Sequence, residues 1–326
     1  MAKQAAPSSI DLEKQAKREA RRRKWEKGKT TRVLTLMALP PAFLIFLFNY
    51  APMTGLILAF KNFRIVDGIY GSPWVDPWYK NFVFFFKSSD AWIILRNTIG
   101  MNLIFIFLTL IVSVAMAIMI NELKARTTIK IVQTIMFFPY FLSWVVVSYM
   151  LYAFLNHNYG ILNTLLTSLG LPGITWYSES KYWPYILAFM YIWKNAGYNA
   201  VIYYASIMGI DDTLYEAASL DGANRAQSIW HITLPMLKQI ILVMTILAIG
   251  RVMYADFGMF YMLPRNNGAL FATTDVLDTY IYRMLRETGN IAVSSAVGFF
   301  QAIVGFLLIV GSNAVARRID RDSAIF

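Results

Sequence analysis

The stretch Glu216–Pro235, with the sequence EAASLDGANRAQSIWHITLP, lies between two apolar segments that are each long enough to cross a lipid bilayer. It combines an acid, several small residues and a glycine in a short space. Because alanine is a strong helix former, Ala217 and Ala218 are expected to continue a helix that begins upstream of them. Asp221 and Gly222 are expected to end that helix, since glycine adopts a positive φ angle at little cost.

The start of this predicted helix has the spacing of a capping box, Thr213-x-x-Glu216. In such a box the hydroxyl accepts from the backbone N–H of Glu216, and the carboxylate reaches back to the N–H of Thr213. A second short helix is expected from about Asn224, and Pro235 suits the first turn of the next apolar helix. The residues alone leave two interpretations open, a rigid docking element for another protein or a well-capped loop.

The composition indicates a polytopic α-helical membrane protein. Of the 326 residues, 57% are hydrophobic and 15% are charged, whereas a soluble domain has about 25% charged residues. The apolar residues gather in runs of about 20 or more, the length that crosses a bilayer core of about 30 Å. The net charge of +11 comes from cations clustered beside these runs, which favours a topological role over nucleic-acid binding.

The sequence predicts neither a metal site nor a nucleotide site in this chain. It contains no cysteine, and His157 and His231 are not at a metal-ligand spacing. The tripeptide GKT at Gly28–Thr30 has the letters that end a P-loop, but Arg23 occupies the place of the glycine that shapes the phosphate cradle. We therefore expect no ATP hydrolysis by this chain.

Six membrane-spanning helices are predicted from the apolar runs. They cover about Val33–Phe60, Ala91–Ile120, Ile129–Leu155, Pro184–Ile210, Met236–Met262 and Val293–Ala316. Prolines are expected to kink or break the first helix at Pro40, Pro41 and Pro52 and the third at Pro139, because proline removes a backbone donor.

The distribution of lysine and arginine predicts the orientation, because cytosolic flanks of membrane helices are enriched in these residues. The basic N-terminal tail, residues 1–32, and the C-terminal tail, residues 317–326, are both expected in the cytosol. With six spans, the connections 121–128 and 211–235 also lie there.

The three remaining connections, 61–90, 156–183 and 263–292, are then expected on the outer side. In the second of them, leucine and isoleucine recur on one helical face from Ile161 to Leu169, which predicts a short interfacial helix. The predicted organisation is a tail (1–32), a first helix with its outer loop (33–90), a five-helix core (91–316) and a second tail (317–326).

Two cations, Lys194 and Arg251, fall near the middle of the predicted fourth and fifth spans. A charge at that depth is costly unless it is paired or faces water. One interpretation is a polar translocation cavity, and the other is structural, with Arg251 paired to Asp256 or Lys194 reaching toward the interface. The candidates for the translocation path are Trp193, Lys194, Asn195, Tyr198, Asn199, Arg251 and Asp256.

The stretch Glu216–Pro235 resembles the EAA motif of permeases in binding-protein-dependent ABC importers. That motif has E-A-A, a glycine four residues after the second alanine, and I-x-L-P. This chain has Glu216-Ala217-Ala218, then Gly222, then Ile232-Thr233-Leu234-Pro235. The stretches FNYAPMTGLILAFKNF, GSPWVDPWYKNF, FPYFLSWVVVSYML and DTYIYR are similar to the MalF-like carbohydrate permeases. They resemble most the branch for complex oligosaccharides, which includes LplB-type proteins and the permease of an alginate importer.

The resemblance covers roughly Val33 to the C-terminus and implies an all-α membrane protein with the type I ABC importer permease fold. In this family the motif forms a cytosolic coupling helix that docks onto an ATPase subunit, and residues 211–235 are therefore called the EAA loop. The implied coupling residues are Thr213, Tyr215, Glu216, Ala217, Ala218, Asp221, Gly222, Ile232, Leu234 and Pro235.

The resemblance also implies the partners of the chain. They are a second permease subunit in a heterodimer, two cytosolic ABC ATPase subunits that bind ATP and Mg²⁺, and an extracytoplasmic solute-binding protein. The chain itself is expected to be a multi-pass protein of the cytoplasmic (inner) membrane that holds no cofactor and is not an enzyme.

The implied substrate is an oligosaccharide. Arg251 differs from the pattern of the complex-oligosaccharide branch, which often has a neutral polar residue at this position of the fifth span. The two cations near mid-depth, Lys194 and Arg251, favour an acidic, uronate-containing sugar. The negative charge of Asp256 would neutralise part of this positive charge. The alternative substrate is therefore a neutral oligosaccharide or another small solute. A self-sufficient secondary transporter would show inverted repeats, and a membrane enzyme would show clustered acids or histidines; the sequence shows neither pattern.

Overall fold

The computed structural model describes residue 25 and residues 31–319 of the chain. Most of the predicted N-terminal tail and the end of the C-terminal tail lie outside the described residues. Within these, the regular elements are helices, and one isolated β-bridge joins Lys61 and Trp74. The chain divides into two compact units, Met1–Ile57 and Leu58–Phe326, which are described separately.

The first predicted span is a single helix, Thr31–Phe60, most of which belongs to the first unit. Pro40 and Pro41 do not break it, contrary to the prediction, because both lie within its α-helical part. The helix changes to a π-helical turn (η1, Phe46–Tyr50) and then to a 3-10 helix (η2, Ala51–Phe60). Pro52 lies next to that junction, where its missing N–H interrupts the α-helical hydrogen bonds.

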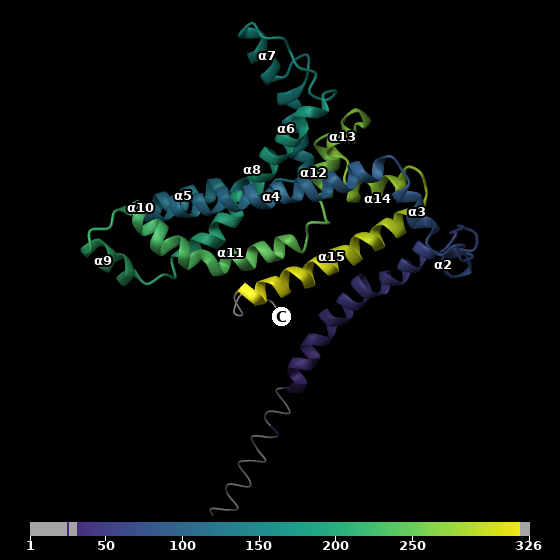
Figure 1. Cartoon of the computed structure of the whole chain (residues 1–326), viewed down its shortest axis with the longest axis horizontal. Helices are drawn as coiled ribbons and strands as arrows, with labels where there is room; N and C mark the ends of the chain where they lie inside the picture. Colours follow the sequence, from purple (N-terminus) through teal and green to yellow (C-terminus); the bar gives the residue numbers. More distant parts are fainter. Residues whose placement is uncertain (1–24, 26–30, 320–326) are drawn as a thin grey trace, which may run out of the picture. The chain divides into compact units, whose positions relative to one another are not determined.

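Four long helices form the centre of the second unit (Figure 1). Helices α4 (Asp90–Asn121) and α8 (Trp183–Ile207) pack along each other. Helix α11 (Leu234–Ile249) packs against both of them, and α15 (Ile291–Ile319) packs against α11. Buried apolar side chains of α4, α8 and α11 meet between these helices, which places the core along their contact line.

Shorter elements connect and flank the long helices. These are α2 (Gly68–Gly71), α3 (Lys80–Phe86), α5 (Arg126–Phe137), η3 (Phe138–Phe141), α6 (Trp144–Leu155), α7 (Ile161–Ser168), η4 (Ser180–Tyr182), α9 (Asp212–Leu220), α10 (Arg225–Ser228), η5 (Ile229–Thr233), α12 (Phe257–Met262), η6 (Gly268–Leu270), α13 (Phe271–Thr274) and α14 (Leu277–Arg286). Helix α7 confirms the predicted short helix from Ile161, and its place at the membrane interface stays a prediction.

The third predicted span is broken, as expected at Pro139. Helix α5 ends at Phe137 and α6 begins at Trp144, and the two parts meet at an angle of 95°. Residues 138–143 between them are called the α5–α6 break. The bend leaves backbone carbonyl groups without helical partners, so other groups must bind them.

The prediction of the fifth span as one helix, Met236–Met262, was wrong. Helix α11 ends at Ile249, and the chain is irregular until α12 begins at Phe257. Residues 250–256 are called the α11–α12 break. Side chains of three other helices hold it in place: Asn102 of α4 and Gln301 of α15 donate to its carbonyl oxygens at 2.9 Å and 2.7 Å, and Asp278 of α14 accepts one of its N–H groups at 2.8 Å.

Four helices of the described part are long and apolar enough to cross a membrane, and the bent α5–α6 pair makes five if it counts as one span. The remaining predicted span corresponds to α8. Its 25 residues reach about 37 Å at 1.5 Å per residue, which is long enough for a bilayer core. Lys194, Asn195 and Asn199 make it less apolar than the others.

Candidate coupling surface and polar pocket

The first helix of the EAA loop, α9, begins two residues earlier than the predicted capping box requires. Asp211 is its N-cap, and the Asp211 carboxylate accepts from the backbone N–H of Thr213 at 3.0 Å. The prediction that Thr213 and Glu216 cap the helix was therefore wrong, because Thr213 already lies in the first turn. The hydrogen bond from the Thr213 backbone lowers the pKa of the Asp211 carboxyl below its ordinary value.

The turn after α9 has the predicted glycine geometry. Gly222 has a φ angle of +82°, in the left-handed region that favours glycine. The N–H of Ala223 donates to the carbonyl of Ala218 at 2.9 Å, which satisfies a carbonyl at the end of the helix. Helix α10 then starts with Asn224 as its N-cap, in a capping box with Gln227. The predicted start of the second helix is confirmed.

The second helix is not a separate short element. Helix α10, the π-helical turn η5 and α11 form one continuous helix, Arg225–Ile249. Pro235 lies in the first turn of α11, as predicted. The Tyr215 hydroxyl and the Thr233 hydroxyl lie 2.9 Å apart and join α9 to this long helix.

The EAA loop exposes large apolar side chains that are not among the predicted coupling residues. Leu220 is 89% exposed and Trp230 is 69% exposed. Leu214 and Ala217, which lie six and three residues before Leu220 on the same side of α9, are exposed as well. An exposed apolar patch of this kind on a polar connection marks an interaction surface. The signal was present in the sequence as apolar residues within a connection that is otherwise polar.

A pocket of 640 Å³ lies between the EAA loop and the ends of α4 and α8. Tyr215 and Glu216 line it from the loop, and Asn121 lines it from α4. At its edge Arg225 forms an exposed ion pair with Glu122, with N···O at 3.1 Å. Such a surface pair contributes little to stability, so its contribution here is to link the two connections 121–128 and 211–235.

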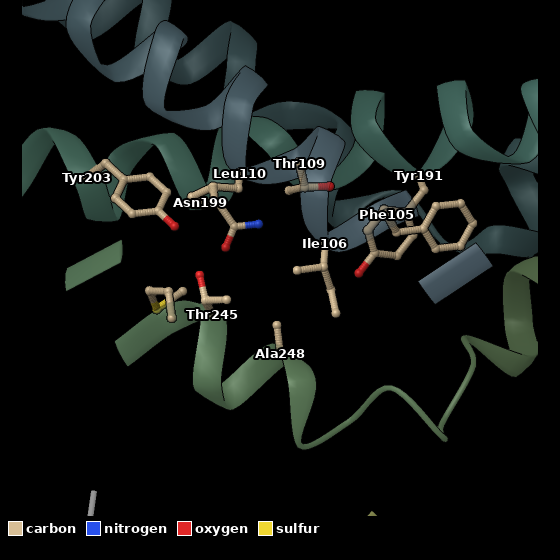
Figure 2. A pocket seen from close by; sticks show the side chains of 10 residues that line it. Phe105, Ile106, Thr109, Leu110, Tyr191, Asn199, Tyr203, Thr245 and Ala248 are labelled. Atoms are coloured by element: carbon tan, nitrogen blue, oxygen red, sulfur yellow. The ribbon is translucent and has the colours of Figure 1, made fainter. Parts of the chain in front are cut away.

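A second, smaller pocket of 160 Å³ lies between α4, α8 and α11 (Figure 2). Figure 2 shows the Tyr203 hydroxyl, the Asn199 amide and the Thr245 hydroxyl directed toward the same part of the pocket. At the other end of the pocket the rings of Phe105 and Tyr191 stack with centroids 4.3 Å apart. Polar groups and aromatic rings therefore line one pocket between three apolar helices.

The polar pocket contains one of the predicted path residues, Asn199, and several that were not predicted. Thr109, Tyr203 and Thr245 also line it, and the buried Thr109 hydroxyl has no hydrogen-bond partner among the residues that the structure describes. Ligand pockets usually measure about 300–1,000 Å³. A pocket of 160 Å³ is therefore too small to hold an oligosaccharide within this chain alone.

The other candidates on α8 lie away from the polar pocket. Lys194 is buried against the α5–α6 break, where its ammonium donates to backbone carbonyls. Tyr198 stacks on Tyr140 of the same break, with ring centroids 4.5 Å apart. Trp193 lines an apolar pocket between α6 and α8, and Asn195 donates to the Tyr191 carbonyl within its own helix.

The last two candidates belong to the α11–α12 break. Arg251 is exposed, and it forms no ion pair with Asp256 within the described part of the chain. Asp256 instead caps α12 by accepting from the N–H of Met259 and also binds the indole N–H of Trp144.

Comparisons with known proteins agree with this arrangement. Residues 109–323 match the family model described as the inner membrane component of binding-protein-dependent transport systems. The polygalacturonan/rhamnogalacturonan transport system permease protein YteP of Bacillus subtilis (strain 168) is 33% identical over 306 residues, 94% of each chain. Protein LplB of the same organism is 32% identical over 292 residues, which are 89% of this chain and 90% of LplB.

A solved structure shows the same fold. A chain in the crystal structure of a bacterial ABC transporter involved in the import of the acidic polysaccharide alginate has a TM-score of 0.82 and 31% identity. The match covers 91% of this chain and 99% of that chain. The fold is that of a type I ABC importer permease, and the resemblance to carbohydrate permeases is confirmed.

Proposed function

This chain belongs to the family of inner membrane components of binding-protein-dependent transport systems, and from that premise we propose that it is one permease subunit of an ATP-driven importer for acidic oligosaccharides. The chain is a transport subunit and not an enzyme. ATP and Mg²⁺ bind to two partner ATPase subunits, and a second, different permease completes the translocation path.

The EAA loop is the proposed docking element for an ATPase subunit. The exposed apolar side chains of α9 supply the contact surface, and the rigid turn at Gly222 fixes its shape. The link between Tyr215 and Thr233 gives a route by which movement of α9 reaches α11. Since α11 lines the polar pocket, movement of the docking element changes the wall of the proposed path.

The polar pocket is proposed as one part of that path. Its size is too small for an oligosaccharide, and the second permease supplies the opposite wall. The proposed orientation has both tails and the EAA loop in the cytosol, in a cytoplasmic (inner) membrane. A solute-binding protein then delivers the sugar on the outer side. In support, a bacterial alginate ABC transporter that contains a chain similar to this one has been solved in complex with an alginate pentasaccharide-bound periplasmic protein.

The likeness to a chain of an importer for an acidic polysaccharide, over 91% of this sequence, is the observation that carries the substrate proposal. YteP is named for polygalacturonan and rhamnogalacturonan. Arg251 adds a physical reason, because its guanidinium is exposed and forms no ion pair with the residues that the structure describes. Such a guanidinium is suited to hold a carboxylate through two parallel hydrogen bonds. A neutral oligosaccharide or another small solute is the alternative.

The test reconstitutes the importer with its partner chains and measures binding-protein-stimulated ATPase activity and uptake. A uronate oligomer and a neutral oligomer of equal length are compared in the wild type and in Arg251→Gln. We expect uptake of the uronate oligomer, and a selective loss of this uptake in the variant. Uptake of the neutral oligomer alone would contradict the acidic substrate, and equal loss of both would show that Arg251 is structural.

A further inference from the structure

The ammonium of Lys194 lies inside a cage of backbone carbonyl groups. Lys194 is only 9% exposed, and its Nζ donates to the carbonyl oxygens of Tyr140 at 2.9 Å, of Pro139 at 3.4 Å and of Leu142. All three carbonyls belong to the α5–α6 break. An ammonium has three donors and no acceptor, so these three contacts use its whole hydrogen-bonding capacity.

Aromatic rings complete the cage. The Lys194 ammonium lies 5.2 Å from the ring centre of Trp144 and 5.8 Å from that of Tyr140. Both distances are within the range of about 6 Å over which a ring face attracts a cation. Trp144 is the first residue of α6, so the cage joins the α5–α6 break to the first turn of α6.

The face of α8 around Lys194 matches the bend. At Gly197, three residues on, an added Cβ would lie 1.9 Å from the carbonyl oxygen of Met136, so the backbones of α8 and α5 are in direct contact there. At Tyr198, four residues on, the ring stacks on Tyr140 with 12° between the planes. Residues at these spacings lie on one side of a helix, and this side of α8 is shaped for the end of α5.

The charge and the bend depend on each other. If α5 and α6 formed one straight helix, the carbonyl groups of residues 138–143 would pair within that helix. Lys194 would then be a buried cation without partners, which is strongly unfavourable in an apolar environment. An uncharged side chain in its place would remove this penalty, and it would also leave the carbonyl groups of Tyr140 and Leu142 without the ammonium donor. The Pro139 carbonyl would keep its hydrogen bond from the backbone N–H of Leu142 at 3.2 Å. The lysine therefore stabilises the bent form and disfavours the straight one.

We propose that Lys194 is a positioning residue that holds the α5–α6 break in its bent form through its ammonium–carbonyl contacts. In this role the ammonium group binds backbone carbonyl groups of its own chain, so it does not bind a sugar in the translocation path. A role of Lys194 in transport rests on the proposed function of the chain. Helix α5 follows the 121–128 connection, and the ion pair of Glu122 with Arg225 links this connection to the EAA loop. When Lys194 fixes the α5–α6 break, movement of the EAA loop is transmitted through α5 to α6. When the Lys194 contacts are absent, the break bends and α6 does not follow.

The first measurement uses the purified full chain in detergent and needs no partner. Lys194→Met keeps the length of the side chain and removes the charge, and we expect its thermal midpoint to fall by about 5 °C, because hydrogen bonds to a charged group are lost. Lys238→Met, at an exposed lysine of α11, is the matched control and should leave the midpoint unchanged. Equal midpoints of the two variants would overturn the proposal.

The second measurement asks whether an ammonium group is what the site requires. Lys194→Ala removes a side-chain end with the shape of n-propylammonium. We expect n-propylammonium chloride to raise the midpoint of this variant, and tetramethylammonium chloride, which has a charge but no N–H donor, to leave it unchanged. The same effect from both salts, or from neither, would overturn the proposal. If Lys194→Ala does not fold, Lys194→Met alone decides it.

The third measurement uses the assembled importer. We expect Lys194→Met to reduce binding-protein-stimulated ATPase activity several-fold relative to Lys238→Met, and Lys194→Arg to retain more of it because the charge is kept. Stimulation of Lys194→Met at the level of Lys238→Met would overturn the role in coupling. If the wild-type importer shows no stimulation, the proposed function fails, while the detergent measurements still judge the role of Lys194.

Discussion

The indole N–H of Trp144 donates to the carboxylate of Asp256 at 2.6 Å, although the two residues are 112 positions apart in the chain. Trp144 is the first residue of α6, and Asp256 is the N-cap of α12. The bond therefore joins the start of α6, directly after the α5–α6 break, to the α11–α12 break. Each break by itself interrupts a helix, and together they form a connected polar region within an apolar bundle.

Trp144→Phe tests this link. The variant keeps an aromatic ring and removes the donor to Asp256. We expect a loss of about 1.5–3 kcal/mol in the free energy of unfolding, the range for a hydrogen bond to a charged group. Thermal unfolding in detergent measures it, with Trp92→Phe at an exposed tryptophan of α4 as the control. A loss no greater than that of the control would show that the bond contributes nothing to stability.

Substitution of Gly222 tests the shape of the EAA loop. An added Cβ at Gly222 meets no atom within 4 Å, so the φ angle of +82° is what restricts substitution. Gly222→Ala is expected to strain the turn by about 1–2 kcal/mol, Gly222→Asn by less, and Gly222→Pro to distort it most. We expect membrane insertion to be normal and binding-protein-stimulated ATPase activity to fall in the order Asn, Ala, Pro.

Gly209→Ala is the matched control for this series, because Gly209 has no positive φ angle and the added Cβ would make an ordinary contact at 3.4 Å. Wild-type stimulation in Gly222→Pro would show that the shape of the turn does not matter for coupling.

Labelling of single cysteines tests the predicted orientation in this cysteine-free chain. Ser219→Cys lies on the exposed surface of α9, and Ser168→Cys lies at the exposed end of α7. In intact cells an impermeant thiol reagent should label Ser168→Cys and leave Ser219→Cys unlabelled until the membrane is opened. Ser8→Cys in the basic tail should behave like Ser219→Cys. The reverse pattern would invert the proposed topology.

The pH dependence of stability tests the environment of Asp278. Burial raises the pKa of this carboxyl above its ordinary value of 3.8, although the N–H of Ala255 and the amide of Gln301 oppose the shift. The folded chain therefore holds this proton more tightly than the unfolded chain. The resulting stability is fully present below the ordinary pKa and is lost as the pH rises through the raised pKa.

Asp278→Asn removes this contribution and keeps an oxygen acceptor for Ala255. We expect the thermal midpoint of the wild type to decline from about pH 4 upward, because this is where the ordinary pKa of aspartate lies. The midpoint of the variant should decline less over the same range. Parallel profiles of the two chains would mean that Asp278 does not titrate with a raised pKa.

The sequence by itself determined the class of the protein and the location of its EAA loop. The length of the apolar runs is a local property, because any helix that crosses a bilayer core needs about 20 apolar residues. The turn at Gly222 and the start of the second helix at Asn224 were also predictable, since caps and glycine turns depend on neighbours within a few residues. The spacing from Glu216 to Pro235 was sufficient to indicate the family.

Only the tertiary structure decided where the spanning helices break and what the buried charges contact. The end of α11 at Ile249 depends on side chains of α4, α14 and α15 that bind the backbone of residues 250–256. Lys194 was selected for a translocation cavity because its charge and depth were visible, while its carbonyl partners lie more than 50 positions earlier in the chain. A buried polar group is defined by its hydrogen-bond partners, and packing between distant helices supplies them.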